Sequence, residues 1–170
     1  FDVPHSRHND ISRAQLEAHG LGVLAESETG GVHMAVSPDK FRIVYFQGHP
    51  EYDINSLLKE YRREVFRFLE GELDTPPPFP EHYFPEAAQR IAARFIEDAL
   101  CAREAGRPVR DTLEQEIGAM LDNTWGDTAK AIVNNWLGLV YRLTNLDRKQ
   151  QFMAGIDPND PLGLQSDGNR

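Results

Sequence analysis

The residues best suited to acid–base chemistry lie in the stretch VYFQGHPEYD, residues 44–53. His49 and Glu51 are two positions apart, and on extended backbone two such residues point to the same side. A carboxylate bonded to one imidazole nitrogen fixes the tautomer and leaves the other nitrogen to accept a proton. The spacing therefore suits an acid–base dyad. His-x-Glu also occurs by chance, and Glu51 or Asp53 could instead cap the helix that follows.

Other reactive side chains have simpler explanations. Cys101 lies late in a predicted helix and off its apolar stripe, where the helix dipole disfavours a thiolate, so we do not expect it to be a nucleophile. His5 and His8 could hold a metal ion on a helical turn, but no cysteine or acidic cluster has recognisable ligand spacing. We predict no metal site. Trp125, Trp136 and Tyr141, which recur at helical spacing, are expected in a core or a subunit interface rather than at a cofactor site.

Composition limits the class of protein. The 170 residues are 40% apolar and 26% charged, as in ordinary globular proteins. A formal net charge of −9 repels nucleic acid and anionic lipid, so neither is an expected partner. The sequence lacks the ~18 to 20 apolar residues of a membrane helix and the regions of a signal peptide, which makes the cytoplasm the expected compartment. Because the chain begins at Phe1 rather than Met, we expect it to be the interior of a longer polypeptide.

The first part of the chain reads as short extended segments. Turn residues separate three predicted strands at 22–25, 32–36 and 41–46, and a helix is expected from the N-cap Ser12 to a close at Gly20. The run 43–46 is continuously apolar, which predicts a strand covered on both faces. His49 then lies beyond the carboxyl end of a strand, where open α/β sheets collect their functional sites.

After Pro50 the pattern is helical. A helix is predicted over about 54–69, a second over about 88–106, and two more within 111–146, broken near Gly126. The proline-rich stretch 75–85 is either an ordered connector or a flexible linker. These patterns predict four regions: 1–74 as part of an α/β core, 75–85 as connector, 86–154 as helical region and 155–170 as mobile tail.

Two motifs resemble those of one enzyme family. GHPEYD after an apolar strand, with VPHSRH upstream at residues 3–8, resembles the homoserine O-acyltransferase family, whose core is similar to class I glutamine amidotransferases. LLKEYRREV (57–65) and NNWLGLVYRLT (134–144) resemble its C-terminal portion, whereas 75–130 looks like an enlarged helical insertion. The resemblance implies an α/β fold: the C-terminal part of a flavodoxin-like, class I glutamine amidotransferase-like sheet with flanking helices and an extra C-terminal helical region.

The resemblance also implies a two-step acyl transfer. A cysteine thiolate attacks the thioester of succinyl- or acetyl-coenzyme A, and the acyl group passes to the hydroxyl of L-homoserine, on the route to methionine. His49 matches the general base and Glu51 the residue that orients it. Ser6 and Arg7 match substrate-contacting positions, and Arg63 matches an arginine that binds the homoserine carboxylate, as a planar guanidinium can. Acyl-coenzyme A is a co-substrate, and no cofactor is expected.

Two features depart from that family pattern. Its cysteine lies upstream of the motifs seen here, so we expect this chain to carry only the base part of the site and to need the N-terminal half of the enzyme, in a homodimer. Arg63 lies about 180° from the apolar stripe of its helix, on a face that is usually solvated. Two alternatives stay open: a glutamine amidotransferase-like class I hydrolase, and a non-enzymatic helical oligomerisation domain.

Overall fold

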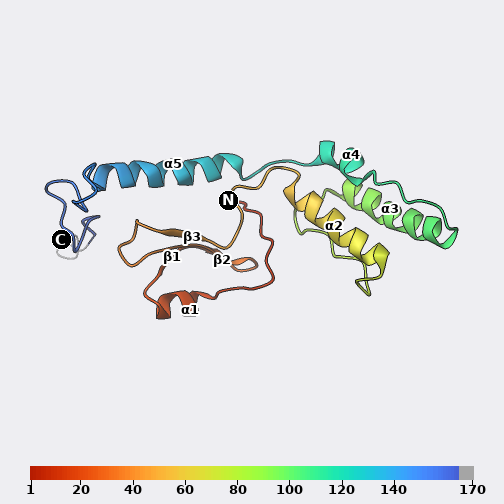
Figure 1. Cartoon of the computed structure of the whole chain (residues 1–170), viewed down its shortest axis with the longest axis horizontal. Coiled ribbons are helices and arrows are strands. Elements are labelled where there is room, and N and C mark those ends of the chain that lie inside the picture. Colours follow the sequence, from red (N-terminus) through yellow and green to blue (C-terminus); the bar gives the residue numbers. More distant parts are fainter. Residues whose placement is uncertain (165–170) are drawn as a thin grey trace. The chain divides into compact units, whose positions relative to one another are not determined.

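A computed structural model describes residues 1–164 of the chain. Contacts divide the chain into two compact units, one formed by Phe1–Pro50 together with the chain from Trp125, and the other by Glu51–Thr124. The division at residues 50 and 124 separates the sheet from three of the helices (Figure 1). The four regions expected from the sequence stay a prediction.

The first unit is built on a three-stranded sheet. Its strands are β1 (Gly22–Ser27), β2 (Gly31–Val36) and β3 (Val44–Phe46), in the spatial order β1-β2-β3. Both neighbouring pairs run antiparallel. The three predicted strands are thus present, and the chain has the α/β composition expected. β2 is the central strand and is the most buried of the three.

The expectation that residues 43–46 form a strand covered on both faces is wrong for the described chain. β3 has three residues at the edge of the sheet, and Ile43, Tyr45 and Phe46 are 49%, 42% and 38% exposed. An apolar run predicts burial without saying what supplies it. Here the residues of the first unit cover the central strand and leave the edge strand open.

Two helices complete the first unit. α1 (Arg13–Ala18) begins after Ser12, which forms a capping box with Gln15, and the chain leaves it through Gly20 at φ +76°, as the sequence predicts. α5 (Gly126–Leu143) is tied to the loop before β3, since the indole Nε1 of Trp136 donates a hydrogen bond to the Phe41 carbonyl at 2.7 Å.

The second unit is helical. It contains α2 (Ser56–Glu70), α3 (Glu86–Glu104), α4 (Leu113–Ile117) and a short 3₁₀ turn at Gly118–Met120. The predicted break within 111–146 is confirmed, because α5 begins at Gly126. These helices share one buried apolar cluster, with α2 contributing Leu58, Tyr61, Val65 and Leu69, α3 contributing Ala88, Ala92, Phe95, Ile96 and Ala99, and α4 contributing Leu113 and Ile117.

The proline-rich connector is ordered rather than a flexible linker. Its Phe84 is buried, and the ring packs edge-on against Tyr61 with centroids 5.2 Å apart. The Tyr83 hydroxyl donates a hydrogen bond to the Ile54 carbonyl. Aromatic side chains supply the packing that proline cannot, so the segment is held on the helical core.

The predicted mobile tail, 155–170, lies partly outside the described residues, which end at 164. Up to that point the chain forms turns, in which Gly163 N–H donates to Asp160 O at 3.0 Å and Leu164 N–H to the Asp160 carboxylate at 2.9 Å. Over residues 1–164, no helix combines the length and the hydrophobicity that crossing a membrane requires.

Candidate active site

His49 lies just beyond the carboxyl end of β3 and is tied to the N-terminal segment. Its backbone N–H donates to the Pro4 carbonyl at 2.7 Å, and its ring Nε2 is 3.2 Å from the Ser6 carbonyl. Because a carbonyl can only accept, Nε2 carries the proton in this contact, and in the neutral ring the lone pair is on Nδ1. The structure thus places the Ser6 backbone carbonyl beside His49, and the expected contact of Ser6 with substrate stays a prediction.

Arg7 is half-buried, and its guanidinium has three internal partners. One amino group meets Nδ1 of His5, and the other donates to the Gly30 carbonyl at 2.6 Å and pairs with Asp10 at 2.9 Å. These contacts join the N-terminal segment to the turn between β1 and β2. Arg7 therefore holds the N-terminal segment against this turn. Its expected contact with substrate stays a prediction.

Gly48 lies where two histidines and a carbonyl converge. A Cβ atom placed on it would be 2.8 Å from His33 Nδ1, 2.9 Å from His5 Nε2 and 3.0 Å from the Pro4 carbonyl oxygen. A real side chain cannot come that close to backbone without displacing it. A glycine before the histidine is therefore what allows the HPE segment to pack on the HSR segment.

His33 on β2 is a titratable side chain of this region to which no sequence pattern assigned a catalytic role. It is 4% exposed, and neither ring nitrogen has a hydrogen-bond partner among residues 1–164. Burial, and then the charges of His5 and Arg7, lower the pKa of His33 to about 4. Burial and Arg7 also lower the pKa of His5. Both rings are therefore neutral near pH 7, beside the candidate base.

Gln47 is a second residue that the sequence analysis did not select. Its side-chain amide accepts from the Ile11 N–H at 2.8 Å and donates to the Ile11 and Val32 carbonyls at 2.8 and 3.0 Å. Its backbone N–H donates to the His33 carbonyl at 2.9 Å. Gln47 thus joins the N-terminal segment to β2 immediately before His49. A glutamine two places before the histidine was the only sequence signal for this role.

The two remaining candidates, Glu51 and Arg63, belong to the second unit. Glu51 is exposed at the start of that unit. Arg63 lies on α2 with its side chain 62% exposed, and its Nε is 3.1 Å from the Glu64 carboxylate. The periodicity argument that Arg63 faces away from the apolar core is confirmed. Its role toward a substrate, and the pairing of Glu51 with His49, stay predictions.

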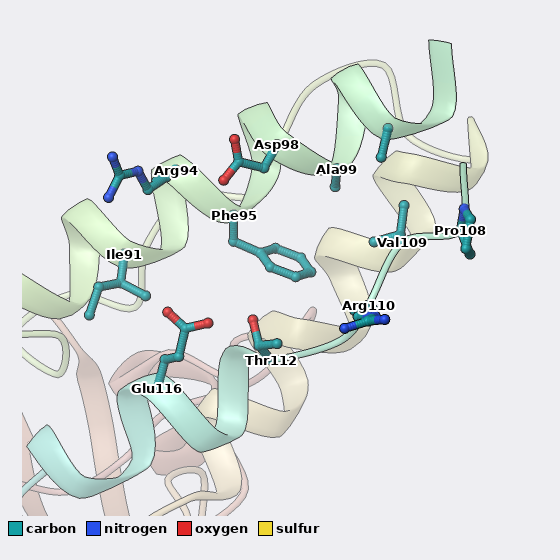
Figure 2. Close-up of a pocket in the computed structure, with 11 residues that line it drawn as sticks. Ile91, Arg94, Phe95, Asp98, Ala99, Pro108, Val109, Arg110, Thr112 and Glu116 are labelled. Carbon is teal, nitrogen blue, oxygen red and sulfur yellow. The ribbon is translucent and has the colours of Figure 1, made fainter. Parts of the chain in front are cut away.

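One pocket lies in the second unit and contains none of the predicted site residues. It has a volume of about 350 Å³ and lies between α3, α4 and the segment that connects them. Figure 2 shows the Phe95 ring projecting into it, with Asp98 of α3 and Glu116 of α4 at its rim. Within residues 1–164 no group of three or more histidine, cysteine or acidic side chains is arranged to hold a metal ion. Cys101 is exposed.

The first unit thus defines a class: an α/β chain that holds a candidate general-base histidine beyond the end of a strand, against a second motif near its N-terminus. The family model of homoserine O-succinyltransferase matches residues 1–146. The chain belongs to that family.

Individual relatives agree with the family match. The chain is 58% identical over 165 residues to a homoserine O-succinyltransferase of Nitrosococcus oceani. The matched region covers 97% of this chain and 46% of that protein. It is 56% identical over 164 residues to a homoserine O-succinyltransferase of Methylococcus capsulatus, covering 96% of this chain and 46% of the relative. The chain therefore spans about half the length of the relatives that it matches.

Proposed function

We propose that this chain forms the general-base part of an enzyme that transfers a succinyl group from succinyl-coenzyme A to the hydroxyl of L-homoserine. The observation that carries the proposal is the anchoring of His49 to Pro4 and Ser6, which unites the two motifs of the family in one site. The names of the relatives favour succinyl over acetyl as the transferred group. The reaction is a step of methionine biosynthesis in the cytoplasm.

In the first half-reaction His49 acts as a general base. A cysteine thiol, supplied from outside this chain, loses its proton to the imidazole and attacks the thioester carbon of succinyl-coenzyme A. The bond to the coenzyme A sulfur breaks, and the imidazolium returns the proton to the departing thiolate. The Ser6 carbonyl holds the other ring proton on Nε2, so that Nδ1 is the nitrogen that exchanges the reacting proton.

In the second half-reaction the same nitrogen takes the proton of the homoserine hydroxyl. The oxygen attacks the succinyl-enzyme thioester, the carbon–sulfur bond breaks, and the imidazolium returns the proton to the departing cysteine thiolate, which restores the thiol and the neutral base. Glu51 stabilises the imidazolium that forms in each half-reaction, because a carboxylate favours the charged form of a neighbouring histidine. A bidentate guanidinium at Arg63 binds the homoserine carboxylate, and its exposure leaves it accessible to a ligand.

The rest of the enzyme completes the fold and the site. We assign the three described strands to the C-terminal part of a flavodoxin-like, class I glutamine amidotransferase-like core. The N-terminal half of the polypeptide supplies the cysteine, and two copies form a homodimer. The boundaries at 74, 85 and 154 mark the core portion, the connector and the helical region of this chain, and residues 75–130 form the enlarged insertion.

Succinyl transfer in the longer enzyme that contains this chain tests the proposal. Release of the coenzyme A thiol is followed with homoserine present, and His49→Gln should lower kcat about 10²- to 10⁴-fold. Arg63→Lys should raise KM for homoserine and leave the first acylation unchanged, because it keeps the charge but loses the planar fork. His19→Gln, an exposed histidine of the same unit, is the matched control.

Three results would count against the proposal. Full activity in His49→Gln would exclude the general base. Succinyl transfer by the 170-residue chain alone would contradict the need for an outside cysteine. Glutamine hydrolysis without homoserine acylation would favour the amidotransferase-like alternative.

A further inference from the structure

His33 is a buried polar side chain of the candidate site that has no hydrogen-bond partner among the described residues. It lies on the central strand, its ring is buried, and its two nitrogens have no hydrogen-bond partner within residues 1–164. A buried polar atom without a partner costs about 1–3 kcal/mol, so such an atom in a folded protein calls for an explanation. A leucine or valine would fill the same space on a central strand at no such cost.

The neighbouring ring of His5 is the candidate hydrogen-bond partner of His33. Nδ1 of His5 faces the Arg7 guanidinium, which has only donors, so this nitrogen must be the acceptor. In the neutral ring the proton of His5 is then on Nε2. That Nε2 and the Nδ1 of His33 approach the same point, the position of a Cβ on Gly48, at 2.9 and 2.8 Å.

We propose that His33 is a positioning residue, whose Nδ1 accepts the Nε2 proton of His5 and so extends a chain of hydrogen bonds from Arg7 through His5 to the central strand. The two ring centroids are 5.7 Å apart at an angle of 65°. The two nitrogens are not within hydrogen-bond distance in the structure, and the proposed bond needs a rotation about χ2, which is a broad torsion in histidine. The other nitrogen of His33 then carries the proton, and the rings of Phe1 and Phe46 have their centroids 5.9 and 5.5 Å from that of His33.

The consequence reaches His49 through the backbone. His5 lies between Pro4 and Ser6, and these are the two residues whose carbonyls bind the backbone N–H and the ring Nε2 of His49. Fixing His5 on the sheet therefore fixes the carbonyl that orients the candidate base. This catalytic consequence rests on the proposed function, whereas the hydrogen bond itself does not.

The charged and titratable groups around the pair are consistent with a neutral chain. Arg7 and His49 disfavour a charge on His5, and Asp10 partly opposes them. Asp2 lines the small cavity beside His33. With both rings neutral, one donates and the other accepts, as the proposed bond requires.

Nitrogen-15 NMR of histidine side chains in the labelled 170-residue chain tests the hydrogen bond without any catalysis. At pH 7 both His5 and His33 should be neutral with the proton on Nε2, and the His5 Nε2–H signal should exchange slowly with water. A His33 protonated on Nδ1 would be a donor toward His5 and would overturn the proposal, as would a His5 proton that exchanges as fast as that of the exposed His19.

Two variants of the longer enzyme test the positioning role. His33→Leu fills similar space without an acceptor and should lower kcat for succinyl transfer about tenfold, the effect of one lost hydrogen bond. His33→Gln offers an amide oxygen to His5 and should restore kcat to within about threefold of the wild type. Equal loss in the two variants would indicate a purely structural role and overturn the proposal. If no variant and no wild type transfers succinyl, the proposed function fails while the NMR result still decides the hydrogen bond.

Discussion

The backbone N–H of His49 donates to the carbonyl of Pro4 at 2.7 Å, so a residue just after the last strand and a residue near the start of the chain occupy one site. Neither motif in isolation distinguishes a catalytic histidine from a structural one. Their contact places the candidate base beside the HSR segment, where the His49 ring also meets the Ser6 carbonyl and the Arg7 guanidinium meets His5. The contact is made by backbone atoms, which makes it sensitive to the residue between Gln47 and His49.

Gly48→Ala should destabilise the chain by about 1–3 kcal/mol, because the new methyl group would overlap two imidazole nitrogens and the Pro4 carbonyl. Urea unfolding followed by circular dichroism measures the loss. Gly138→Ala on α5 is the matched control, since a Cβ there meets no atom within 4 Å. Removing a glycine from a helix interior should stabilise the chain by about 0.5–1 kcal/mol. Similar effects of the two substitutions would contradict the close packing at Gly48.

The chain should lose stability as the pH falls from about 6.5 toward 4. The folded pKa of His33 is about 4 against an ordinary 6.5, so the unfolded chain binds more protons in this window and stability rises with pH. The loss attributable to His33 is roughly 3 kcal/mol once the pH is below 4. His5 contributes with the same sign.

Comparison with His33→Gln isolates this effect from the carboxylates, which also weaken the fold as they are protonated. Unfolding free energies at pH 7 and pH 4.5 should differ less in His33→Gln than in the wild type. An identical pH dependence in both chains would mean that His33 is not buried in its neutral form.

Tyr61→Phe should leave the helical unit as stable as before, or stabilise it by about 1 kcal/mol. The Tyr61 hydroxyl is buried without a partner among the described residues, and burial raises its pKa to about 12. Removing an unsatisfied hydroxyl while keeping the ring is close to neutral or favourable. Tyr61→Ala, which leaves a cavity beside Phe84, should cost about 3–5 kcal/mol. Thermal unfolding of both variants measures the contrast, and a large loss in Tyr61→Phe would reveal a partner for the hydroxyl.

Trp136→Phe should loosen α5 from the loop before β3. The substitution keeps an aromatic ring but removes the 2.7 Å hydrogen bond to the Phe41 carbonyl, at a cost of about 1 kcal/mol. Amide hydrogen exchange should increase along α5 and near Phe41, and remain unchanged in the helices of the second unit. Uniform exchange across all helices would contradict a local role.

Local patterns predicted the elements well, because their determinants are local. Ser12 is the N-cap expected at the start of α1, where it forms a capping box with Gln15, and the helix closes at Gly20 as expected. The break near Gly126 was predicted because the stretch with helical periodicity, 111–146, is too long for one helix. Arg63 lies on the exposed face that its angular position indicates.

Other features depend on contacts that no local pattern records. The apolar run 43–46 predicted a covered strand, but β3 is an exposed edge because burial depends on what packs against a strand and not on its own sequence. His33 sits in an apolar strand sequence, VHMAV, where a histidine has no periodic signal. Its meaning depends on Gly48 and His5, which are distant in sequence and adjacent in space.

The Gln47 side chain makes hydrogen bonds to backbone groups that a neighbouring β-strand would otherwise make. Its amide offers one acceptor and two donors to the backbone of Ile11 and Val32, the same exchange that a neighbouring strand would make. One side chain therefore fixes the end of the N-terminal segment at Ile11, while Arg7 and the His49–Pro4 contact hold the part before it. Glutamate there would set an oxygen against two carbonyls, and asparagine would fall short by one methylene. Because Gln47 binds the backbone of Ile11, a change of the Ile11 side chain keeps these hydrogen bonds, whereas a substitution at position 47 removes them.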